Sequence, residues 1–583
     1  MKTAQQDIPW RFLDTYRGTH FHGSWPTLPE LFTITTERFP DRQCYTVYDP
    51  ERSSMPYSEA LAIIGRVANF LRSIKIDHGD KVAVSGKNSP EWAIAYMATL
   101  FAGATVVPID YQLKDAEIDK LLSVSGAKAL FIDEERFERF RAGKAAPRGV
   151  FSLSRNHDSY IYHLESKRTY KITPARQDDL AAILFTSGTT GTPKGVMLTH
   201  ANFVSDCFLA QANLGIFHTD VFYALLPLHH SYCMLAVFIE SMSVGAELVF
   251  GKRMVITQIL HDLKEARVTM FLGVPMLFNK VLNGIMRGVR RKGIVVYALV
   301  RFLMGVSGLI KKLFRRNPGK KIFRSVLDKA SLATVRICIC GGGPLAPSVF
   351  RRYNQLGIDF VQGYGLTETA PILTLNPVEH YKETSVGRVI PEVDMRIIDP
   401  DERGAGEIVV KGPMVMQGYY NLPRETAEVF TEDGYFKTGD IGYLDHENYL
   451  YLTGRAKNMI VTEGGKNVYP EEIENGFQLY EEIEQIMVRG YQQDPHQKVE
   501  RIEALVYPNP ELFQDQLQGG QRGRMAVEKR VNEIVAEVNR EAAPYQRISR
   551  VQVLDQPMEM TTTRKIKRHA VQDEGRQDQT ALS

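Results

Sequence analysis

The sequence predicts an α/β protein with a large N-terminal domain of doubly wound sheets, a small β-barrel subdomain and a small α+β C-terminal domain. Three observations lead to this prediction. Apolar runs of strand length alternate with helical patterns to about residue 375, shorter alternating runs follow Arg388, and a new unit begins after Gly454 and Arg455. A chain of 583 residues also exceeds one compact core, so it requires at least two domains, and nearer four by length alone.

The N-terminal pattern is typical of βαβ units around parallel sheets. Residues 58–75 and 90–102 carry apolar side chains at helical spacing. Short apolar runs at Lys81–Ser85, Val106–Ile109 and Ala129–Ile132 lie between and after them, as buried strands would.

The second half of the chain predicts two smaller units. Runs such as MRIID, GEIVVKG and NYLYLTGR, separated by Gly, Pro and Asp, indicate a small barrel or antiparallel sheet at about 385–454. A strand, a glycine turn, a helix opening at Pro470, a second strand and a helix near 525–541 then form an α+β unit. We therefore expect domains at 1–454 and 455–570, with a polar, disordered tail at 571–583.

Composition restricts the class of protein. Hydrophobic residues make up 44% and charged residues 24%, which is ordinary globular usage. Five scattered cysteines without a CxxC pair argue against a disulfide framework and a structural zinc site, and the N-terminus lacks an apolar signal-peptide core. We expect a cytoplasmic protein that does not bind nucleic acid. The cysteines are Cys44, Cys207, Cys233, Cys338 and Cys340.

Positive charge is concentrated in one segment. Between Val281 and Ser325 there are twelve Lys or Arg residues and no Asp or Glu. The formal net charge is +3, so subtracting these twelve leaves −9 on the remainder. A basic segment on an otherwise acidic protein is a local electrostatic feature.

Residues 184–195, LFTSGTTGTPKG, form the most informative stretch. An apolar run delivers three glycines, five hydroxyls and Lys194, which together can surround phosphate oxygens with N–H groups, hydroxyl donors and positive charge. The loop is not a Walker A motif, because Gly-Lys-Ser/Thr is absent. An ordinary surface turn is the alternative. The residues expected to bind nucleotide here are Thr186, Ser187, Gly188, Thr189, Thr190, Gly191 and Lys194.

TSGTTGTPKG resembles the phosphate-binding signature of the adenylate-forming, or AMP-binding, superfamily of acyl-CoA synthetases, adenylation domains and luciferases. That resemblance implies further motifs in a fixed order. The stretch Gly363-Tyr364-Gly365-Leu366-Thr367-Glu368 is similar to the YGxTE motif. By resemblance, Tyr364 offers a face to adenine, Thr367 contacts a phosphate and Glu368 is the Mg²⁺ ligand.

Two later motifs complete the expected nucleotide site. The stretch ending at Asp440 resembles the TGD motif, which implies that this carboxylate accepts hydrogen bonds from the ribose hydroxyls. The stretch GRAKN resembles the hinge motif, in which Arg455 contacts nucleotide and Lys457 is the pivot of a mobile C-terminal lid. A plain polar interdomain linker would contain the same residue types.

Three motifs are expected to line the acyl and coenzyme A (CoA) sites. The stretch LPLHHSY resembles the LPLFH motif, with His230 in the histidine position and His229 in place of an aromatic residue, and no spaced partners suggest a metal. CICGGGPL resembles the SGGAPL strand end. By resemblance, the acyl pocket includes His230, Gly341, Gly342 and Gly343, and the GGxN loop that forms the CoA passage includes Glu463, Gly464, Gly465 and Lys466.

The C-terminal stretch TTTRKIKR resembles the motif that carries the catalytic lysine. Lys565 takes that position, and an ammonium there can neutralise the carboxylate and α-phosphate as they meet. Arg564 replaces the usual glycine, so Lys567 is the fallback, and a basic solvated tail is the alternative. The catalytic residues implied by the resemblance are Lys565, Thr186, Glu368 and His230.

The motif set implies an ATP-dependent acid:CoA ligase that uses Mg²⁺. A carboxylate attacks the α-phosphorus of ATP to give acyl-AMP and pyrophosphate, and the CoA thiol then displaces AMP, with one hinge serving both steps. An acyl-AMP ligase, an aryl-CoA ligase and a non-catalytic lipid-binding scaffold remain as alternatives. The resemblance leaves a homodimer open.

The family resemblance covers about residues 28–570. Within it, GGKNVYPEEIE and the long segment before Cys338 look most like long-chain fatty acyl-CoA synthetases, so the acid is expected to be a fatty acid of medium to long chain. Residues 293–310 form an apolar run interrupted by Arg301. A membrane-spanning helix fits by length, but a central Arg costs about 2.5–3.5 kcal/mol on insertion scales. We expect an interfacial helix, with peripheral contact of residues 287–324 with the inner face of the cell membrane. A core-packed helix is the alternative.

Overall fold

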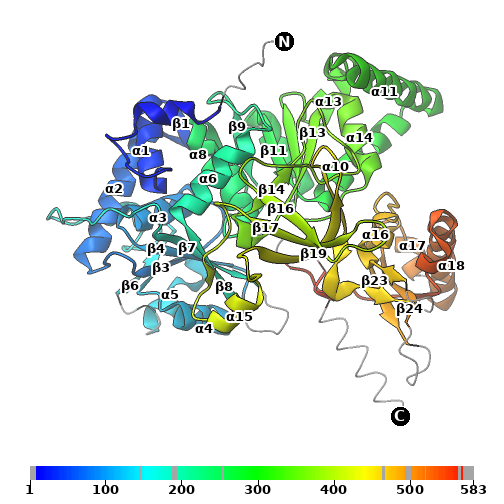
Figure 1. The fold of residues 1–583 in the computed structure, drawn as a ribbon. Helices are drawn as coiled ribbons and strands as arrows, with labels where there is room; N and C mark the ends of the chain where they lie inside the picture. The colour runs from blue at the N-terminus through cyan, green and yellow to red at the C-terminus, as the bar shows by residue number, and fades with distance from the viewer. Residues whose placement is uncertain are drawn as a thin grey trace, which may run out of the picture.

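The computed structural model describes residues 8–143, 146, 148–186, 193–252, 255–462, 466–492, 500–518, 520–561 and 566–568 (Figure 1). Two large sheets with helices around them form the body of the protein, and a smaller unit near the C-terminus lies at its side. The predicted α/β class is confirmed. The five cysteines are buried and free.

The nine-stranded sheet has the order β15-β14-β13-β12-β11-β9-β10-β1-β2. Its centre, from β13 to β1, is parallel, and β14, β15 and β2 add antiparallel edges. Every residue of the run ICIC in β12 is buried, as a parallel strand covered on both faces must be. The strands are β1 (Gln43–Val47), β2 (Ser53–Pro56), β9 (Val221–Ala224), β10 (Glu247–Phe250), β11 (Met270–Gly273), β12 (Ile337–Cys340), β13 (Asp359–Gly365), β14 (Ile372–Leu375) and β15 (Arg388–Val389).

The seven-stranded sheet has the order β18-β8-β7-β4-β3-β5-β6. The strands predicted at Lys81–Ser85 and Ala129–Ile132 are confirmed residue for residue, and the third begins at Thr105. The strands are β3 (Lys81–Ser85), β4 (Thr105–Ile109), β5 (Ala129–Ile132), β6 (Gly149–Ser152), β7 (Leu180–Thr186), β8 (Lys194–Thr199) and β18 (Gly418–Tyr419).

Helices cover the faces of both sheets. The predicted helices are confirmed as α2 (Tyr57–Ser73) and α3 (Pro90–Phe101), and Ser89 caps α3 by accepting the backbone N–H of Trp92. The other helices of this region are α1 (Leu28–Arg38), α4 (Asp115–Ser125), α5 (Glu134–Ala142), α6 (His200–Gln211), α7 (Ser231–Cys233), the π-helix Met234–Ile239, α8 (Glu240–Val244), α9 (Ile256–Glu265), α10 (Pro275–Arg290), α12 (Gly319–Ile322), α13 (Arg324–Lys329), α14 (Pro347–Leu356) and α15 (Pro423–Glu428).

A four-stranded antiparallel sheet occupies the segment for which a barrel or antiparallel sheet is predicted. Its order is β16 (Asp394–Ile398), β17 (Gly406–Lys411), β19 (Phe436–Leu444) and β20 (Leu450–Arg455). The register pairs Asp440 in β19 with Arg455 in β20, so two predicted nucleotide ligands become cross-strand neighbours.

The chain after Arg455 forms an α+β unit with its own hydrophobic core. Its three-stranded sheet contains β23 (Ile483–Tyr491), β24 (Arg501–Pro508) and β25 (Arg550–Val553), and β21 (Ile460–Val461) pairs with β22 (Asn467–Val468). Helix α16 (Pro470–Asn475) opens at the predicted proline, and α17 (Gln514–Gln518) precedes α18 (Gly520–Glu541), which starts earlier than predicted. The predicted tail at 571–583 lies outside the described residues.

The basic segment contains a long helix, α11 (Ile294–Phe314), which lies at the periphery of the molecule (Figure 1). It is the one helix of the described residues that is long and apolar enough to cross a membrane, by length and composition. Only Met304, Ser307 and Lys311 of α11 are buried, so the core-packed alternative is wrong. Gly308 lies within α11 at its contact with α14. A Cβ atom at this position would be only 2.8 Å from the Gln355 side chain, so the close contact favours glycine.

Candidate active site

The predicted phosphate loop connects β7 to β8. Thr186 and Lys194 are cross-strand partners at the end of this antiparallel pair, and the Thr186 hydroxyl donates to the Lys194 carbonyl at 3.4 Å. The hairpin therefore fixes both ends of the loop. Its predicted ligands Ser187, Gly188, Thr189, Thr190 and Gly191 lie outside the described residues.

Lys194 is connected to the predicted metal ligand through Tyr419. The Lys194 ammonium lies 4.8 Å from the centre of the Tyr419 ring, and the Tyr419 hydroxyl donates to Glu368 Oε1 at 3.0 Å. Burial raises the pKa of Tyr419, and the Glu368 carboxylate raises it further, so the phenol keeps its proton. No predicted motif included Tyr419, although the Gly-Tyr-Tyr run places it on β18 beside β8.

Tyr364, Asp440 and Arg455 form a second cluster. The Tyr364 hydroxyl donates to Asp440 Oδ2 at 2.7 Å, and Arg455 Nε lies 2.9 Å from Asp440 Oδ1. Asp440 is only 5% exposed. These two contacts orient its carboxylate oxygens, one from β13 and one from β20. Burial and the adjacent Asp440 hold the pKa of Tyr364 well above its usual range. Tyr364 thus also positions the carboxylate, beyond the adenine contact implied by resemblance.

The YGLTE and LPLHHSY motifs meet at their hydroxyls. Thr367 lies in a short 3₁₀ helix, Thr367–Thr369, and its Oγ1 is 3.2 Å from Ser231 Oγ at the start of α7. Gly363 and Gly365 belong to the same strand as Tyr364, and a Cβ atom at Gly365 would lie 1.6 Å from the Pro371 carbonyl oxygen. Only glycine fits at that position.

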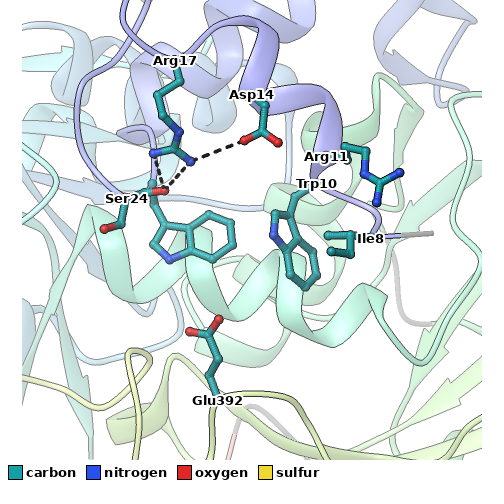
Figure 2. Close-up of a pocket in the computed structure, with 8 residues that line it drawn as sticks. Ile8, Trp10, Arg11, Asp14, Arg17, Ser24 and Glu392 are labelled. Atoms are coloured by element: carbon teal, nitrogen blue, oxygen red, sulfur yellow. Dashed lines mark hydrogen bonds and ion pairs between the residues drawn. The ribbon is translucent and has the colours of Figure 1, made fainter. Parts of the chain in front are cut away.

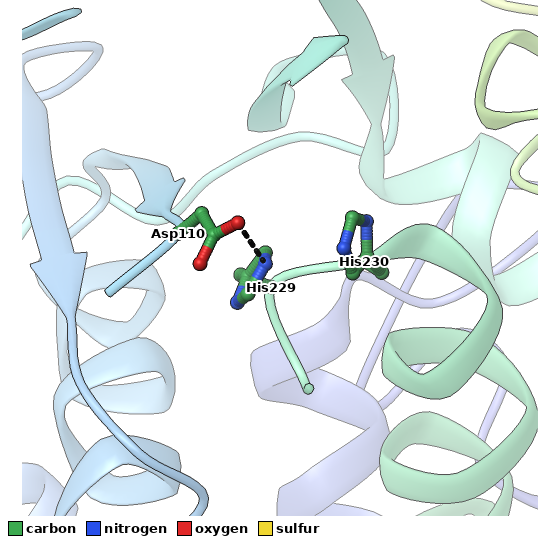
Figure 3. Close-up of side chains that lie close together, drawn as sticks. All are labelled: Asp110, His229 and His230. Atoms are coloured by element: carbon green, nitrogen blue, oxygen red, sulfur yellow. Dashed lines mark ion pairs between the residues drawn. The ribbon is translucent and has the colours of Figure 1, made fainter. Parts of the chain in front are cut away.

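The histidine pair lies beside a carboxylate that sequence patterns did not connect with it. His229 Nε2 is 3.6 Å from Asp110 Oδ2, and the rings of His229 and His230 are 4.3 Å apart between centres (Figure 3). Asp110, His229 and His230 each offer an oxygen or nitrogen atom that could bind a metal ion, and these three atoms lie within 4.8 Å of one another. Asp110 follows β4, so the fold creates this cluster from segments far apart in the chain.

Asn88 holds the histidine loop in place. Its side-chain amide donates to the carbonyls of Ala224 and Leu226 at 3.0 and 2.8 Å and accepts the Leu228 N–H at 2.9 Å. These bonds satisfy the backbone of a buried loop that precedes His229. No motif pointed to Asn88, because its partners come from a distant segment.

The predicted acyl strand end is covered by Tyr232. A Cβ atom at Gly341 would lie 3.0 Å from the Tyr232 ring, and the Tyr232 hydroxyl is 3.0 Å from the Ile339 carbonyl. Gly342 has φ +79°, which favours glycine, and Gly343 faces Pro275. The three glycines therefore make room for Tyr232 and for a turn at the carboxyl ends of the parallel strands, where ligands bind in such sheets.

The predicted hinge follows the nucleotide cluster directly. Lys457 lies in the 3₁₀ helix Ala456–Asn458, and burial lowers its pKa, helped by the charge of Arg455. The Asn458 side chain donates to Glu471 at 2.6 Å, which ties the segment to α16. Of the predicted CoA passage, Lys466 precedes β22, while Glu463, Gly464 and Gly465 lie outside the described residues.

The C-terminal motif is anchored at its last residue. Arg568 donates to both Glu474 oxygens at 2.6 Å and to the Val488 carbonyl at 2.9 Å. Lys567 pairs with Glu559, which gives the fallback lysine a partner within its own unit. Lys565, the expected catalytic lysine, lies outside the described residues.

The C-terminal unit contacts the acyl strand end and α10. Gln478 accepts the Ala346 N–H at 2.7 Å and donates to the Pro344 carbonyl at 2.8 Å. Lys280 forms an ion pair with Glu484 at 2.8 Å. These contacts place the unit beside the predicted acyl pocket.

A surface pocket near the N-terminus lies apart from these motifs. It contains the Arg17–Asp14 ion pair and two tryptophan side chains (Figure 2). No predicted site residue lines it. Its lining residues are Ile8, Trp10, Arg11, Asp14, Arg17, Ser24, Trp25 and Glu392.

Comparison with known proteins identifies the family of the chain. The model of the AMP-binding enzyme family matches residues 32–420. A feruloyl-CoA synthase of Amycolatopsis sp is 30% identical over 75% of this chain and 81% of its own. A long-chain-fatty-acid–CoA ligase of Bacillus subtilis (strain 168) is 27% identical over 80% and 82%.

Solved structures share the fold over nearly the whole chain. ATP-bound MatB from Rhodopseudomonas palustris has a TM-score of 0.72 at 25% identity and covers 94% of this chain and 99% of its own. The anthranilate CoA ligase AuaEII, with anthranoyl-AMP, has a TM-score of 0.75 at 18% identity, covers 95% of this chain and 98% of its own, and supports the fold alone. The chain belongs to the AMP-binding enzyme family, within the adenylate-forming acyl- and aryl-CoA ligases.

Proposed function

We propose that the enzyme activates a fatty acid of medium to long chain with ATP, through an acyl-AMP intermediate, and transfers the acyl group to CoA. The products are acyl-CoA, AMP and pyrophosphate. One observation carries the proposal: two chains of contacts are joined through one short segment. The first chain contains Lys194, Tyr419 and Glu368, and the second contains Tyr364, Asp440 and Arg455. Tyr364 and Glu368 are four residues apart in the sequence. Groups suited to phosphate and ribose thereby occupy one region.

ATP and CoA are the substrates of this enzyme class, and the described residues fit a nucleotide. Asp440 offers a carboxylate to the ribose hydroxyls, and Arg455 and Lys194 supply positive charge for phosphate. Glu368 fits Mg²⁺, because Tyr419 occupies only one lone pair of Oε1 and a hard oxygen ligand remains. The ion, when bound, would neutralise charge on the phosphates.

The two half-reactions place different demands on the chain. In the first, Lys565 stabilises the charge that develops between the carboxylate and the α-phosphate. In the second, the C-terminal unit turns about Lys457 and brings the loop with Glu463, Gly464, Gly465 and Lys466 to the pantetheine arm. Such a rotation requires the contacts of Gln478 and Glu484 with the N-terminal body to break, the second being the ion pair with Lys280 of α10.

A fatty acid is favoured over an aryl acid by the Bacillus relative and by the apolar helix α11. The feruloyl-CoA synthase and the ring of Tyr232 over Gly341 favour the second candidate, an aryl acid, because an aromatic wall suits a flat substrate. The proposal includes peripheral contact with a cell membrane through residues 287–324, supported by the exposure of α11.

A substrate panel tests the proposal. Purified enzyme is given ATP, Mg²⁺, CoA and acids of increasing chain length, with ferulate and anthranilate included. Acyl-CoA and AMP are expected together, with the highest kcat/KM for acids of medium to long chain. Aryl-CoA as the preferred product would support the second candidate. AMP release that does not depend on CoA would identify an acyl-AMP ligase instead.

A further inference from the structure

We propose that α11 docks the enzyme on an anionic lipid bilayer, lying in the plane of the membrane surface without crossing it. The inference rests on the proposed function, since a bilayer is where long acyl chains partition, and it identifies the lipid class and the docking face. Three features of the described residues carry it: an exposed apolar face, a buried anchor on the opposite face, and basic ends.

The apolar face of α11 is exposed along the whole helix. Val295, Leu299, Phe302, Leu309 and Leu313 are 77%, 54%, 67%, 57% and 64% exposed. Their spacing of three, four or seven residues places them on one face. Soluble proteins rarely expose a continuous row of large apolar side chains unless that surface binds a partner.

The opposite face is fixed to the protein. Met304, Ser307 and Lys311 are buried, and the Lys311 ammonium donates to Asn354 at 2.7 Å and to Asp359 at 2.6 Å. Separating the buried Lys311 ammonium from Asn354 and from the half-buried Asp359 carboxylate would be unfavourable, because it leaves these polar groups without that partner. A spanning orientation would require that separation, whereas a helix that remains on the body can insert only its exposed face.

Charge identifies the partner. The segment 281–325 contains twelve basic residues and no acidic residue, and exposed basic residues flank the apolar face at both ends, while the exposed Arg301 lies near the middle of the helix. A second copy on the same face would bring these like charges together in either helix orientation. Anionic headgroups complement them, while the acyl region accepts the apolar stripe. The exposed basic residues at the two ends are Arg290, Arg291, Lys292, Lys312, Arg315 and Arg316.

Vesicle co-sedimentation tests the docking face. The full chain is mixed with vesicles of phosphatidylcholine alone or with phosphatidylglycerol added, and binding to the second is expected to be far tighter. The face variant is Leu299→Gln/Phe302→Ser/Leu309→Gln, and its matched control is Leu512→Gln/Met525→Gln, at exposed apolar residues elsewhere. The face variant is expected to lose binding to both vesicles, and the control to keep it.

A charge variant separates the electrostatic part. Arg290→Gln/Arg291→Gln/Arg315→Gln/Arg316→Gln is compared with Arg522→Gln/Arg547→Gln, at exposed positions outside the segment. Each neutralised basic residue is expected to weaken binding to anionic vesicles by about fivefold, with no change in the control.

Depth measurements distinguish a flat helix from a spanning one. Val295→Trp, Phe302→Trp and Leu313→Trp are each measured with lipids brominated at different depths. A flat helix predicts quenching at the same shallow depth for all three, and a spanning helix predicts that position 302 is deepest. The latter result would overturn the in-plane orientation.

The remaining outcomes decide between this inference and others. Wild-type protein that stays in the supernatant, or a face variant that binds as well as wild type, overturns the inference. A wild-type dimer that the face variant converts to monomer would make a second copy the partner. Acyl-CoA formation from dissolved medium-chain acid without vesicles is measured alongside: its loss in wild type would refute the proposed function, whereas its retention without vesicle binding refutes only the docking.

Discussion

At the residue scale, the carboxylate of Asp440 connects three segments of the nucleotide site. It accepts a hydrogen bond from the hydroxyl of Tyr364 in β13 and forms an ion pair with Arg455 in β20. The TGD motif predicts a ribose contact for this carboxylate, but it could not predict the two protein partners, because they depend on strand register and on the approach of two sheets. Likewise, the YGxTE motif predicts a metal-ligand role for Glu368, but its partner Tyr419 belongs to no predicted motif.

Replacing Asp440 with Asn is expected to weaken ATP binding. The variant removes the charge that orients Arg455, and the KM for ATP should rise by about 10- to 100-fold, as for the loss of a charge-assisted hydrogen bond. Initial rates at saturating acid and CoA measure this. Asp433→Asn, at an exposed carboxylate of the same subdomain, is the control. An unchanged KM in Asp440→Asn would argue against a ribose contact.

Replacing Tyr419 with Phe tests whether this phenol positions the metal ligand. The ring beneath Lys194 remains, but the hydrogen bond to Glu368 is lost. We expect kcat to fall about tenfold, with a higher Mg²⁺ concentration needed for half-maximal rate. Tyr420→Phe, one residue away, should leave both unchanged. A fall in kcat with an unaltered Mg²⁺ dependence would leave Tyr419 without the positioning role.

Glu240 gives the fold a measurable pH dependence. Burial raises its pKa from 4.5 to about 8, although the Gln211 amide, 2.7 Å away, lowers it. Between these values the folded protein holds a proton that the unfolded chain has released. The free energy of unfolding therefore falls as pH rises through this window, by up to ~1.4 kcal/mol per pH unit from this group.

The Glu240→Gln variant should lack that contribution. Its amide can still accept from Gln211, so its stability is expected to decline less steeply than that of wild type between about pH 4.5 and 8. Urea unfolding at several pH values measures the difference, with the exposed Glu402→Gln as control. Parallel profiles for wild type and Glu240→Gln would show that Glu240 is ionised throughout.

At the element scale, local patterns predict what local forces determine. The runs at Lys81–Ser85 and Ala129–Ile132 are strands because their apolar, β-branched character suits a buried sheet, and the prediction is confirmed to the residue. The placement of helix α11 is harder to predict, since its composition fits a membrane-spanning helix, an interfacial helix and a core helix equally. Only tertiary contacts, those of Lys311 above all, distinguish these, and sequence spacing contains no information on them.

The hinge segment is the element whose motion the account requires. A Lys457→Pro variant restricts the backbone at the proposed pivot. Acid-dependent pyrophosphate exchange should persist within about threefold, while thioester formation from supplied acyl-AMP and CoA slows by about 10-fold or more, in line with a gated conformational step. Lys457→Ala, which keeps the backbone free, should retain both. Equal slowing of both half-reactions in Lys457→Pro would contradict a pivot here.

At the scale of the whole molecule, the proposed function depends on one site that is built from segments as far apart in the sequence as Thr186 and Arg455. The order of the motifs could be predicted, because each is a short local pattern. The proximity of Asp110 to His229, and of Tyr232 to Gly341, arises only when strand ends from different parts of the chain meet. Such contacts are consequences of topology and have no local signature.

The division of labour between the half-reactions predicts the behaviour of Lys565. Lys565→Ala should reduce adenylation by at least about 100-fold, because it removes the ammonium proposed to stabilise the charge that develops between the carboxylate and the α-phosphate, and it should spare thioester formation from supplied acyl-AMP. Lys567→Ala is the matched control and should leave both steps intact, since Lys567 pairs with Glu559. Loss in the control alone would move the catalytic role to Lys567.

The central claim is that the segments containing Lys194, Glu368 and Asp440 surround one ATP molecule that reacts with an organic acid. Acid-dependent exchange of labelled pyrophosphate into ATP, measured without CoA, tests it most directly. Exchange with fatty acids is expected in wild type, and its loss is expected in Asp440→Asn at low ATP. Absence of exchange with every fatty and aryl acid, by protein that is folded and binds Mg²⁺-ATP, would contradict it.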